Sequence, residues 1–476
     1  MARTARPIVL PSLLIAGSCA LALAQEAGLP PGQVIEKVTC YVDPAESYAL
    51  YLPSNYTPAK KWPIVYTFDP MAQGTVPAEK YKDLAERYGY ILVASNNSRN
   101  GSWYDSIRAA LAIWQDTHVR FSLAPRRAYA TGFSGGARVA CALGRMARGE
   151  VAGVIGMGAG FPLGAGQGPS VDLPFIFYGT VGIRDFNYPE MMQLHRTLTD
   201  LNIVHRVEVF DGGHDWAPLP VFVEAIEWME LRAMKTGSRE KDETRVTEWF
   251  NRRLEKAREL EAAGNLAEAF QRFQWLDADF EGLHDVVEVK AEISQFEGTK
   301  ELKKALKRES QRQQRIQAMV DAAYGGFNQA IGPLQEHGGS PSQIRQALDT
   351  LRFSDRLKLA KERQDKEEGI AAERFLGGVL VHAYEEATEA LARNDYATAR
   401  LHLMIAAECA PESAQVHYML ARVYALNKAN KNALAELRTA IEKGFTDREE
   451  LEKNPDFVAL RQTPEFAKLL RQIEKP

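Results

Sequence analysis

Residues 128–146 read AYATGFSGGARVACALGRM, which is an apolar run, a glycine-rich turn and a helical run in succession. The turn contains the pattern Gly-x-Ser-x-Gly, with Ser134 between Gly132 and Gly136. A serine on such a cramped strand-to-helix turn is pushed out at the edge of a sheet, and the glycines leave room for the backbone. The segment therefore predicts Ser134 as a nucleophile, although the same pattern also forms turns with no catalytic role.

This segment belongs to a region, about 34–236, in which short β-rich runs alternate with amphipathic helical runs. Such alternation is typical of a largely parallel sheet covered by helices, so the predicted fold class is α/β. We expect the first two strands to form an antiparallel pair. The strands that the pattern predicts lie at 38–42, 48–52, 63–68, 91–94, 128–132, 154–157, 175–178 and 207–210.

A nucleophilic serine needs a base within hydrogen-bond reach, and histidine suits proton transfer near neutral pH. Four histidines lie in this region: His118, His195, His205 and His214. The first two fall in predicted helices, and His205 precedes the last strand, at the opposite end of the sheet. Only His214 follows that strand, on a glycine-containing loop. We therefore expect His214 to be the base.

The carboxylate that orients the histidine is expected after the penultimate strand, where Asp185 lies. The chain order Ser134, Asp185, His214 is then the order found in α/β-hydrolases. Asp185 could instead cap the helix that begins near Asn187. Two other aspartates remain alternatives: Asp172 and Asp211.

Backbone N–H groups are needed to stabilise the negative charge that develops on a substrate carbonyl oxygen. The amide of Gly135, directly after the nucleophile, is the first expected donor. The second is expected from loop 69–74, where Pro70 has no N–H, so Met71 is the first choice and Ala72 the next.

Three further side chains are candidates for substrate binding. Asn97 and Arg99 lie in the polar loop 96–101, which should border the same cleft, and Trp216 lies beside the expected base. The alternatives are an ordinary polar loop and a tryptophan that packs in the core.

Residues 34–235 resemble the α/β-hydrolase superfamily, near the secreted esterases related to polyhydroxybutyrate depolymerases and feruloyl esterases. The resemblance is carried by YALYLP at 48–53, the turn at Ser134 and Gly-Gly-His at 212–214. It implies ester hydrolysis through an acyl-enzyme, with no metal or organic cofactor. Phe68-Asp69-Pro70 stands where many relatives carry His-Gly, which leaves the second oxyanion donor and the substrate class open. No large lid is expected between Gly158 and Leu173, so the site is expected to be open.

The composition turns charged at 236–243, and the chain beyond it reads as helix. We predict a signal peptide at 1–24, a catalytic domain at 25–237, a linker at 238–244 and an all-α domain at 245–476. Ala399, Leu403 and Ala406 recur 34 residues later as Ala433, Leu437 and Ala440. This is the tetratricopeptide period, and the resemblance is clearest at 383–445. It implies a surface for a protein or peptide partner, and a plain antiparallel bundle is the alternative.

The balance of 58 basic and 62 acidic side chains gives no basic face for nucleic acid or for a membrane surface. Arg3 and Arg6, the apolar run 8–23 and Ala-Leu-Ala at 22–24 indicate a secretory signal, hence a periplasmic or secreted protein. A retained N-terminal helix and a lipid anchor at Cys19 are alternatives.

After cleavage of the signal, three cysteines would remain: Cys40, Cys141 and Cys409. Their number and spacing favour neither a disulfide framework nor a zinc site, although Cys40 could pair with Cys141.

The sequence thus predicts an exported serine hydrolase that cleaves carboxylic esters with a Ser-His-Asp triad. A serine peptidase of the same fold shares the triad and remains open. The third possibility is a catalytically silent scaffold that binds a protein partner through its helical repeats.

Overall fold

The computed structural model describes residues 28–164 and 166–473. The predicted signal peptide at 1–24, with Cys19, lies outside these residues. Among the residues described, no helix combines the length and the apolar character that crossing a bilayer requires.

The first half of the chain forms an eight-stranded sheet with the order β1-β2-β4-β3-β5-β6-β7-β8. Strand β2 runs antiparallel to β1 and β4, and the remaining neighbours pair in parallel. The predicted strands and the antiparallel opening pair are present, with shifted ends. The strands are β1 (Val34–Thr39), β2 (Ser47–Tyr51), β3 (Trp62–Phe68), β4 (Ile91–Ser95), β5 (Leu123–Phe133), β6 (Val151–Met157), β7 (Ile176–Gly182) and β8 (His205–Phe210).

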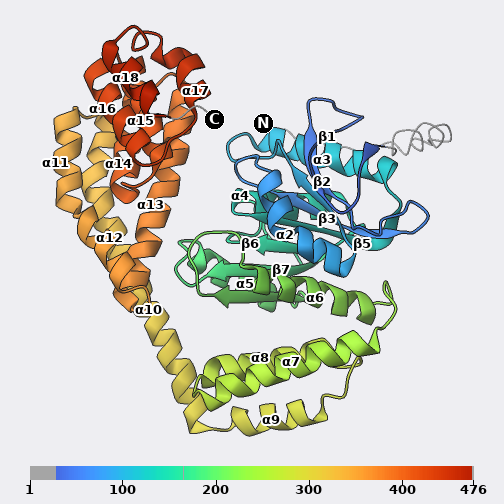
Figure 1. The fold of residues 1–476 in the computed structure, drawn as a ribbon. Helices are drawn as coiled ribbons and strands as arrows, with labels where there is room; N and C mark the ends of the chain where they lie inside the picture. The colour runs from blue at the N-terminus through green and yellow to red at the C-terminus, as the bar shows by residue number, and fades with distance from the viewer. Residues whose placement is uncertain (1–27, 165, 474–476) are drawn as a thin grey trace, which may run out of the picture.

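Helices cover both faces of this sheet, as its apolar strands require (Figure 1). Alternate side chains of each strand enter different cores: in β5, Tyr129 joins the core beneath α2 (Thr75–Tyr88) and α6 (Leu219–Lys235). Its neighbour Ala130 joins the opposite core, beneath α3 (Trp103–Arg120), α4 (Gly135–Met146) and α5 (Tyr188–Asp200). The region is therefore α/β, as predicted.

Three helices after α6 extend the first of these cores. They are α7 (Glu243–Ala262), α8 (Leu266–Phe280) and α9 (Val287–Glu297). Trp249 and Phe273 are buried in the same apolar cluster as Trp228 of α6. Asp279 of α8 accepts hydrogen bonds from Trp228 Nε1, at 2.9 Å, and from Arg206 of β8. The helices that the sequence groups into one region at 245–476 are thus divided between two cores.

The second core begins in α10 (Lys300–His337), a long helix that leads from α9 to the last group of helices (Figure 1). That group is entirely helical, in agreement with the all-α prediction. Its members are α11 (Pro341–Leu351), α12 (Phe353–Glu362), α13 (Glu367–Ala392), α14 (Tyr396–Cys409), α15 (Ala414–Leu426), α16 (Asn430–Glu442), α17 (Arg448–Lys453), the 3₁₀-helix η2 (Pro455–Phe457) and α18 (Pro464–Gln472).

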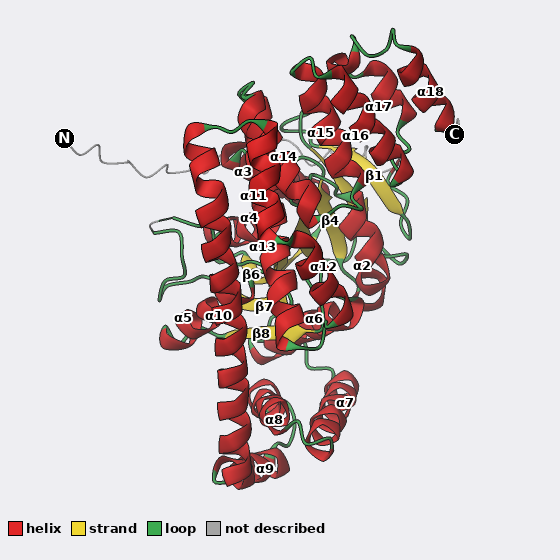
Figure 2. Ribbon diagram, turned by 90° about the vertical axis from the view of Figure 1, so that its left-hand side faces the viewer, coloured by secondary structure: helices red, strands yellow, loops and turns green. Residues whose placement is uncertain are grey.

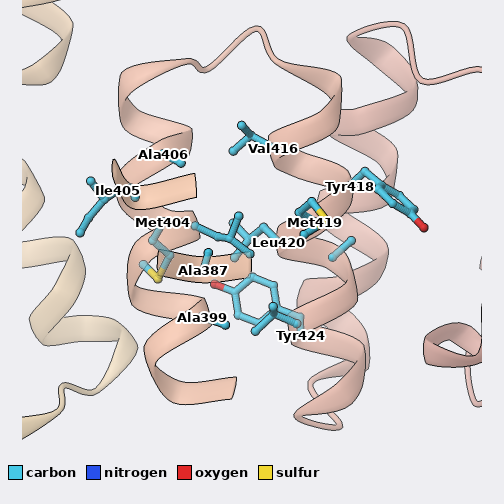
Figure 3. Close-up of a cluster of buried hydrophobic side chains, with 14 of the residues drawn as sticks. Ala387, Ala399, Met404, Ile405, Ala406, Val416, Tyr418, Met419, Leu420 and Tyr424 are labelled. Atoms are coloured by element: carbon cyan, nitrogen blue, oxygen red, sulfur yellow. The ribbon is translucent and has the colours of Figure 1, made fainter. Parts of the chain in front are cut away.

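The small side chains of the 34-residue pattern lie in this second core. Ala399 and Ala406 of α14 are fully buried, as are Ala433 and Ala440 of α16. Figure 3 shows Ala399 and Ala406 on α14, with Leu420 and other large apolar side chains of α15 close by. Small residues at these positions let adjacent helices approach closely. The tetratricopeptide assignment itself stays a prediction.

Cys40, Cys141 and Cys409 are all buried and free, so the pairing of Cys40 with Cys141 that the sequence left open is not formed. Burial raises the pKa of all three thiols, and that of Cys40 reaches about 12. These thiols are therefore protonated and unreactive near neutral pH.

Candidate active site

Ser134 occupies the turn between β5 and α4, in a backbone conformation that is rare for a residue with a side chain: its φ is 52° and its ψ is −123°. Holding a residue there costs on the order of 1–3 kcal/mol. The Ser134 N–H donates to Met157 O at 2.8 Å, which fixes the turn to β6. A Cβ on Gly132 would lie 2.3 Å from the carbonyl carbon of Gly136, so glycine is required there.

The three side chains predicted as a triad meet at the carboxyl end of the sheet. His214 Nε2 lies 3.0 Å from Ser134 Oγ, and His214 Nδ1 lies 2.9 Å from Asp185 Oδ1. Ser134 follows β5, Asp185 follows β7 and His214 follows β8, so parallel strands deliver all three to one edge. Asp185 is 1% exposed, whereas Ser134 and His214 are half-buried. The chain of contacts allows a proton to pass from the hydroxyl to an imidazole whose tautomer the carboxylate fixes.

Asp185 also supports the helix that follows it. Its Oδ1 accepts a hydrogen bond from Asn187 N at 2.7 Å, and Asn187 is the N-cap of α5. Asp185 is therefore not itself the N-cap of α5, and its carboxylate contacts both the His214 ring and the backbone at the start of this helix. The two alternative aspartates lie outside the triad: Asp172 is exposed and paired with Arg148, and Asp211 is exposed and paired with Arg184.

The other histidines of this region are engaged elsewhere. His205 Nε2 lies 2.8 Å from His195 Nδ1, near the start of β8, and His118 Nδ1 contacts Trp114 O at 2.7 Å. The His214 ring instead packs against two aromatic rings, Phe133 and Phe186, at centroid distances of 4.6 and 4.2 Å. These rings hold the imidazole over the serine.

The predicted oxyanion donors have different surroundings. Gly135 is the first residue of α4, where backbone N–H groups have no acceptor within the helix. The N–H of Met71 donates to Asp69 Oδ1 at 2.7 Å, so Met71, the first choice for the second donor, is not free to bind a substrate oxygen. The same Asp69 oxygen also accepts from Gln73 N at 3.1 Å, so the Asp69 carboxylate occupies two backbone N–H groups of this loop. Ala72 N, the next choice, lies 3.5 Å from Asp69 O.

Burial raises the pKa of the Asp69 carboxyl, and its hydrogen bonds to the Met71 and Gln73 amides act in the opposite direction. The backbone amides of Met71 and Gln73, in the loop after β3, thus donate to the Asp69 carboxylate of the same loop.

Two of the predicted substrate-binding residues have structural roles. Asn97 Oδ1 accepts from Ser47 N at 2.9 Å, so this side chain holds the start of β2 and is not directed at the triad. Trp216 is 7% exposed, and its ring centroid lies 5.7 Å from that of Phe133, as expected for a packing residue. Arg99 is exposed, and its backbone forms a β-bridge with Met71.

The next residue of that loop is Asn100, which the sequence did not single out and which lies against Gly135, the residue after Ser134. A Cβ on Gly135 would overlap the Asn100 side chain, so Asn100 lies directly beside the residue that the sequence predicts as the first oxyanion donor. Asn100 Nδ2 in turn donates to Glu385 Oε1 of α13 at 2.6 Å.

Helix α13 contacts the loops that carry the site, a contact that the sequence left open. Glu373 Oε2 lies 3.0 Å from Arg184 Nε, in the loop that carries Asp185. A Cβ on Gly377 would lie 3.4 Å from Phe186, the ring that packs on His214. The site is therefore not as open as the short 158–173 segment suggested, because its cover comes from a helix far along the chain.

No family model and no curated protein matches the sequence. Among solved structures, the chain is similar to a ferulic acid esterase, with 16% identity, a TM-score of 0.34, and coverage of 42% of this chain and 96% of that one. It is similar to an S-formylglutathione hydrolase from Staphylococcus aureus, with 15% identity, a TM-score of 0.35 and coverage of 42% and 99%. The third is a ferulic acid esterase from the anaerobic fungus Anaeromyces mucronatus, with 20% identity, a TM-score of 0.32 and coverage of 41% and 89%.

The strand order and the turn at Ser134 are those of an α/β-hydrolase fold. This fold hosts many chemistries, so the function must be argued from the site itself.

Proposed function

We propose that the protein is a serine hydrolase that cleaves carboxylic esters through an acyl-enzyme intermediate. The observation that carries this proposal is the position of His214. Its Nε2 lies 3.0 Å from Ser134 Oγ, and its Nδ1 lies 2.9 Å from Asp185 Oδ1. The ester as substrate class follows from the sequence resemblance, since a triad alone serves esters and peptides equally.

In the first half of the reaction, Ser134 Oγ attacks the carbonyl carbon while His214 Nε2 takes the hydroxyl proton. The Gly135 N–H is the proposed donor to the oxygen of the tetrahedral intermediate. His214 then gives its proton to the departing alcohol. In the second half, water attacks the acyl group on Ser134 with the same histidine as base, and the free acid leaves.

The proposal is tested by incubating the full chain with a fluorophosphonate probe and locating the label by mass spectrometry. We expect a single label on the peptide that contains Ser134, no label on Ser134→Ala, and turnover of short-chain aryl esters by the wild type alone. Absence of both label and turnover in the folded wild type would leave the scaffold alternative. Turnover of peptides but not of esters would replace the esterase by a peptidase.

Asp185→Asn is expected to lower kcat by about 10³-fold or more with little change in KM, because an amide presents the wrong partner to His214 and favours the wrong tautomer. Asp211→Asn is the matched control, since Asp211 is an exposed aspartate on the neighbouring loop, paired with Arg184. Its kcat should stay within about twofold of wild type. Steady-state ester hydrolysis measures both, and equal kcat values in the two variants would contradict the role of Asp185.

Export and a protein partner remain proposals as well. The pattern at 1–24 supports export to the periplasm or the medium, and the 34-residue spacing supports a peptide or protein contact on the helices at 383–445.

A further inference from the structure

The side chain of Arg374, on α13, is buried against the loop that carries Asp185. It is 2% exposed, and both Nε and Nη2 donate to the carbonyl oxygen of Ile183, at 3.0 and 2.6 Å. Its guanidinium lies 4.1 Å from the centroid of the Tyr188 ring, at the start of α5. Figure 2 shows α13 among the helices in front of the sheet, with β6, β7 and β8 behind them.

This buried cation has no carboxylate partner within ion-pair distance among the residues that the structure describes. Within 28–164 and 166–473, its one hydrogen-bond acceptor apart from Ile183 O is Gln313 Oε1 of α10, at 3.3 Å. An isolated buried charge costs free energy that an apolar side chain of the same volume would avoid. Packing between α13 and the loop therefore does not explain why an arginine stands here.

The charges around Arg374 lie on three elements. Burial lowers its pKa to about 10, Tyr188 and Asp185 act in the opposite direction, and Arg312 of α10 lowers it further. The guanidinium thus stays charged near neutral pH. The negative charge of the Asp185 carboxylate stabilises this charged form.

The loop held by Arg374 sets the direction of the triad carboxylate. The turn is closed by a hydrogen bond from Asp185 N to Gly182 O at 3.0 Å, and Ile183 lies inside this turn. Asp185 Oδ1 contacts His214, whereas Asp185 Oδ2 is buried with no hydrogen-bond partner among the described residues. A shift of the turn would move Oδ1 away from the imidazole, and nothing on Oδ2 would resist it.

We propose that Arg374 is a positioning residue, which fixes the Ile183 carbonyl so that Asp185 faces His214, and that α13 thereby forms part of the active site. This inference rests on the proposed function. Arg374 contacts the Ile183 carbonyl and the Tyr188 ring and touches no reacting atom. Its loss should therefore slow the chemical step and leave substrate binding unchanged.

The test compares full-chain variants in steady-state hydrolysis of an aryl ester. We expect Arg374→Met to lower kcat by 10- to 100-fold with KM within twofold. Arg374→Lys keeps the charge but cannot offer the same two donors, so we expect a kcat 3- to 10-fold below wild type. Arg356→Met is the matched control, because the Arg356 guanidinium packs on Phe375 of α13 and donates to Leu351 O, and no hydrogen bond or ion pair found among the described residues joins it to the Asp185 loop. Its kcat should equal that of the wild type.

Circular dichroism identifies a variant that fails to fold. If Arg374→Met does not fold, Arg374→Lys decides, and a wild-type kcat in that variant overturns the proposal. A folded Arg374→Met with kcat within threefold of wild type, or with a changed KM and an unchanged kcat, overturns it as well. Inactive wild-type protein would instead refute the proposed function, so the two failures are distinguishable.

Discussion

His214→Gln is expected to lower kcat for ester hydrolysis by about 10⁵-fold or more while the protein stays folded. Glutamine fills much of the same space between Phe133 and Phe186, but it cannot accept the proton of Ser134 at neutral pH. Labelling of Ser134 by a fluorophosphonate should slow in parallel, because that reaction needs the same base. Stopped-assay turnover and the rate of labelling measure the two effects independently.

The matched control is His205→Gln, which removes a half-buried histidine at the other end of β8. We expect its kcat to stay within about twofold of wild type, since its partner is His195 and not the triad. A His214 variant that retains a tenth of the wild-type activity would show that another group deprotonates the serine.

Gly136→Ala is expected to lower the free energy of unfolding by about 3 kcal/mol or more. A Cβ at this position would lie 1.9 Å from the carbonyl oxygen of Phe68, which belongs to the backbone of β3 and cannot rotate away. Alanine also favours the helical state of α4 by about 1 kcal/mol over glycine, and this gain is smaller than the cost of the overlap. Urea unfolding followed by tryptophan fluorescence measures the difference.

Gly168→Ala is the control for this substitution, because a Cβ there meets no atom within 4 Å and the residue does not lie at positive φ. Its stability should stay within about 0.5 kcal/mol of wild type. Equal stability of the two variants would mean that β3 and the turn at Ser134 can separate without cost.

The three side chains that the sequence singled out as a triad each stand beside a local signal, and the structure brings them within hydrogen-bond distance of one another. Ser134 lies in a glycine pattern, His214 follows the last strand, and Asp185 follows the strand before it. Parallel strands bring their carboxyl ends to one edge, so the order of the elements was enough to infer convergence. No such local signal identifies the second oxyanion donor. Met71 is the first choice from the sequence, and only the structure shows that its N–H donates to the Asp69 side chain.

The sequence by itself determined the α/β pattern, the glycine-rich turn at Ser134 and the all-α character of the last region, because periodicity and the Gly-x-Ser-x-Gly pattern are properties of neighbouring residues. The tertiary structure alone decided that α7–α9 join the core of the sheet, that Asn97 serves β2, and that α13 covers the loops of the triad. Arg374 and Ile183 lie 191 residues apart, and their contact depends on how α10 orients the whole second group of helices. Such a contact depends on the packing of the entire chain, and no local run of residues encodes it.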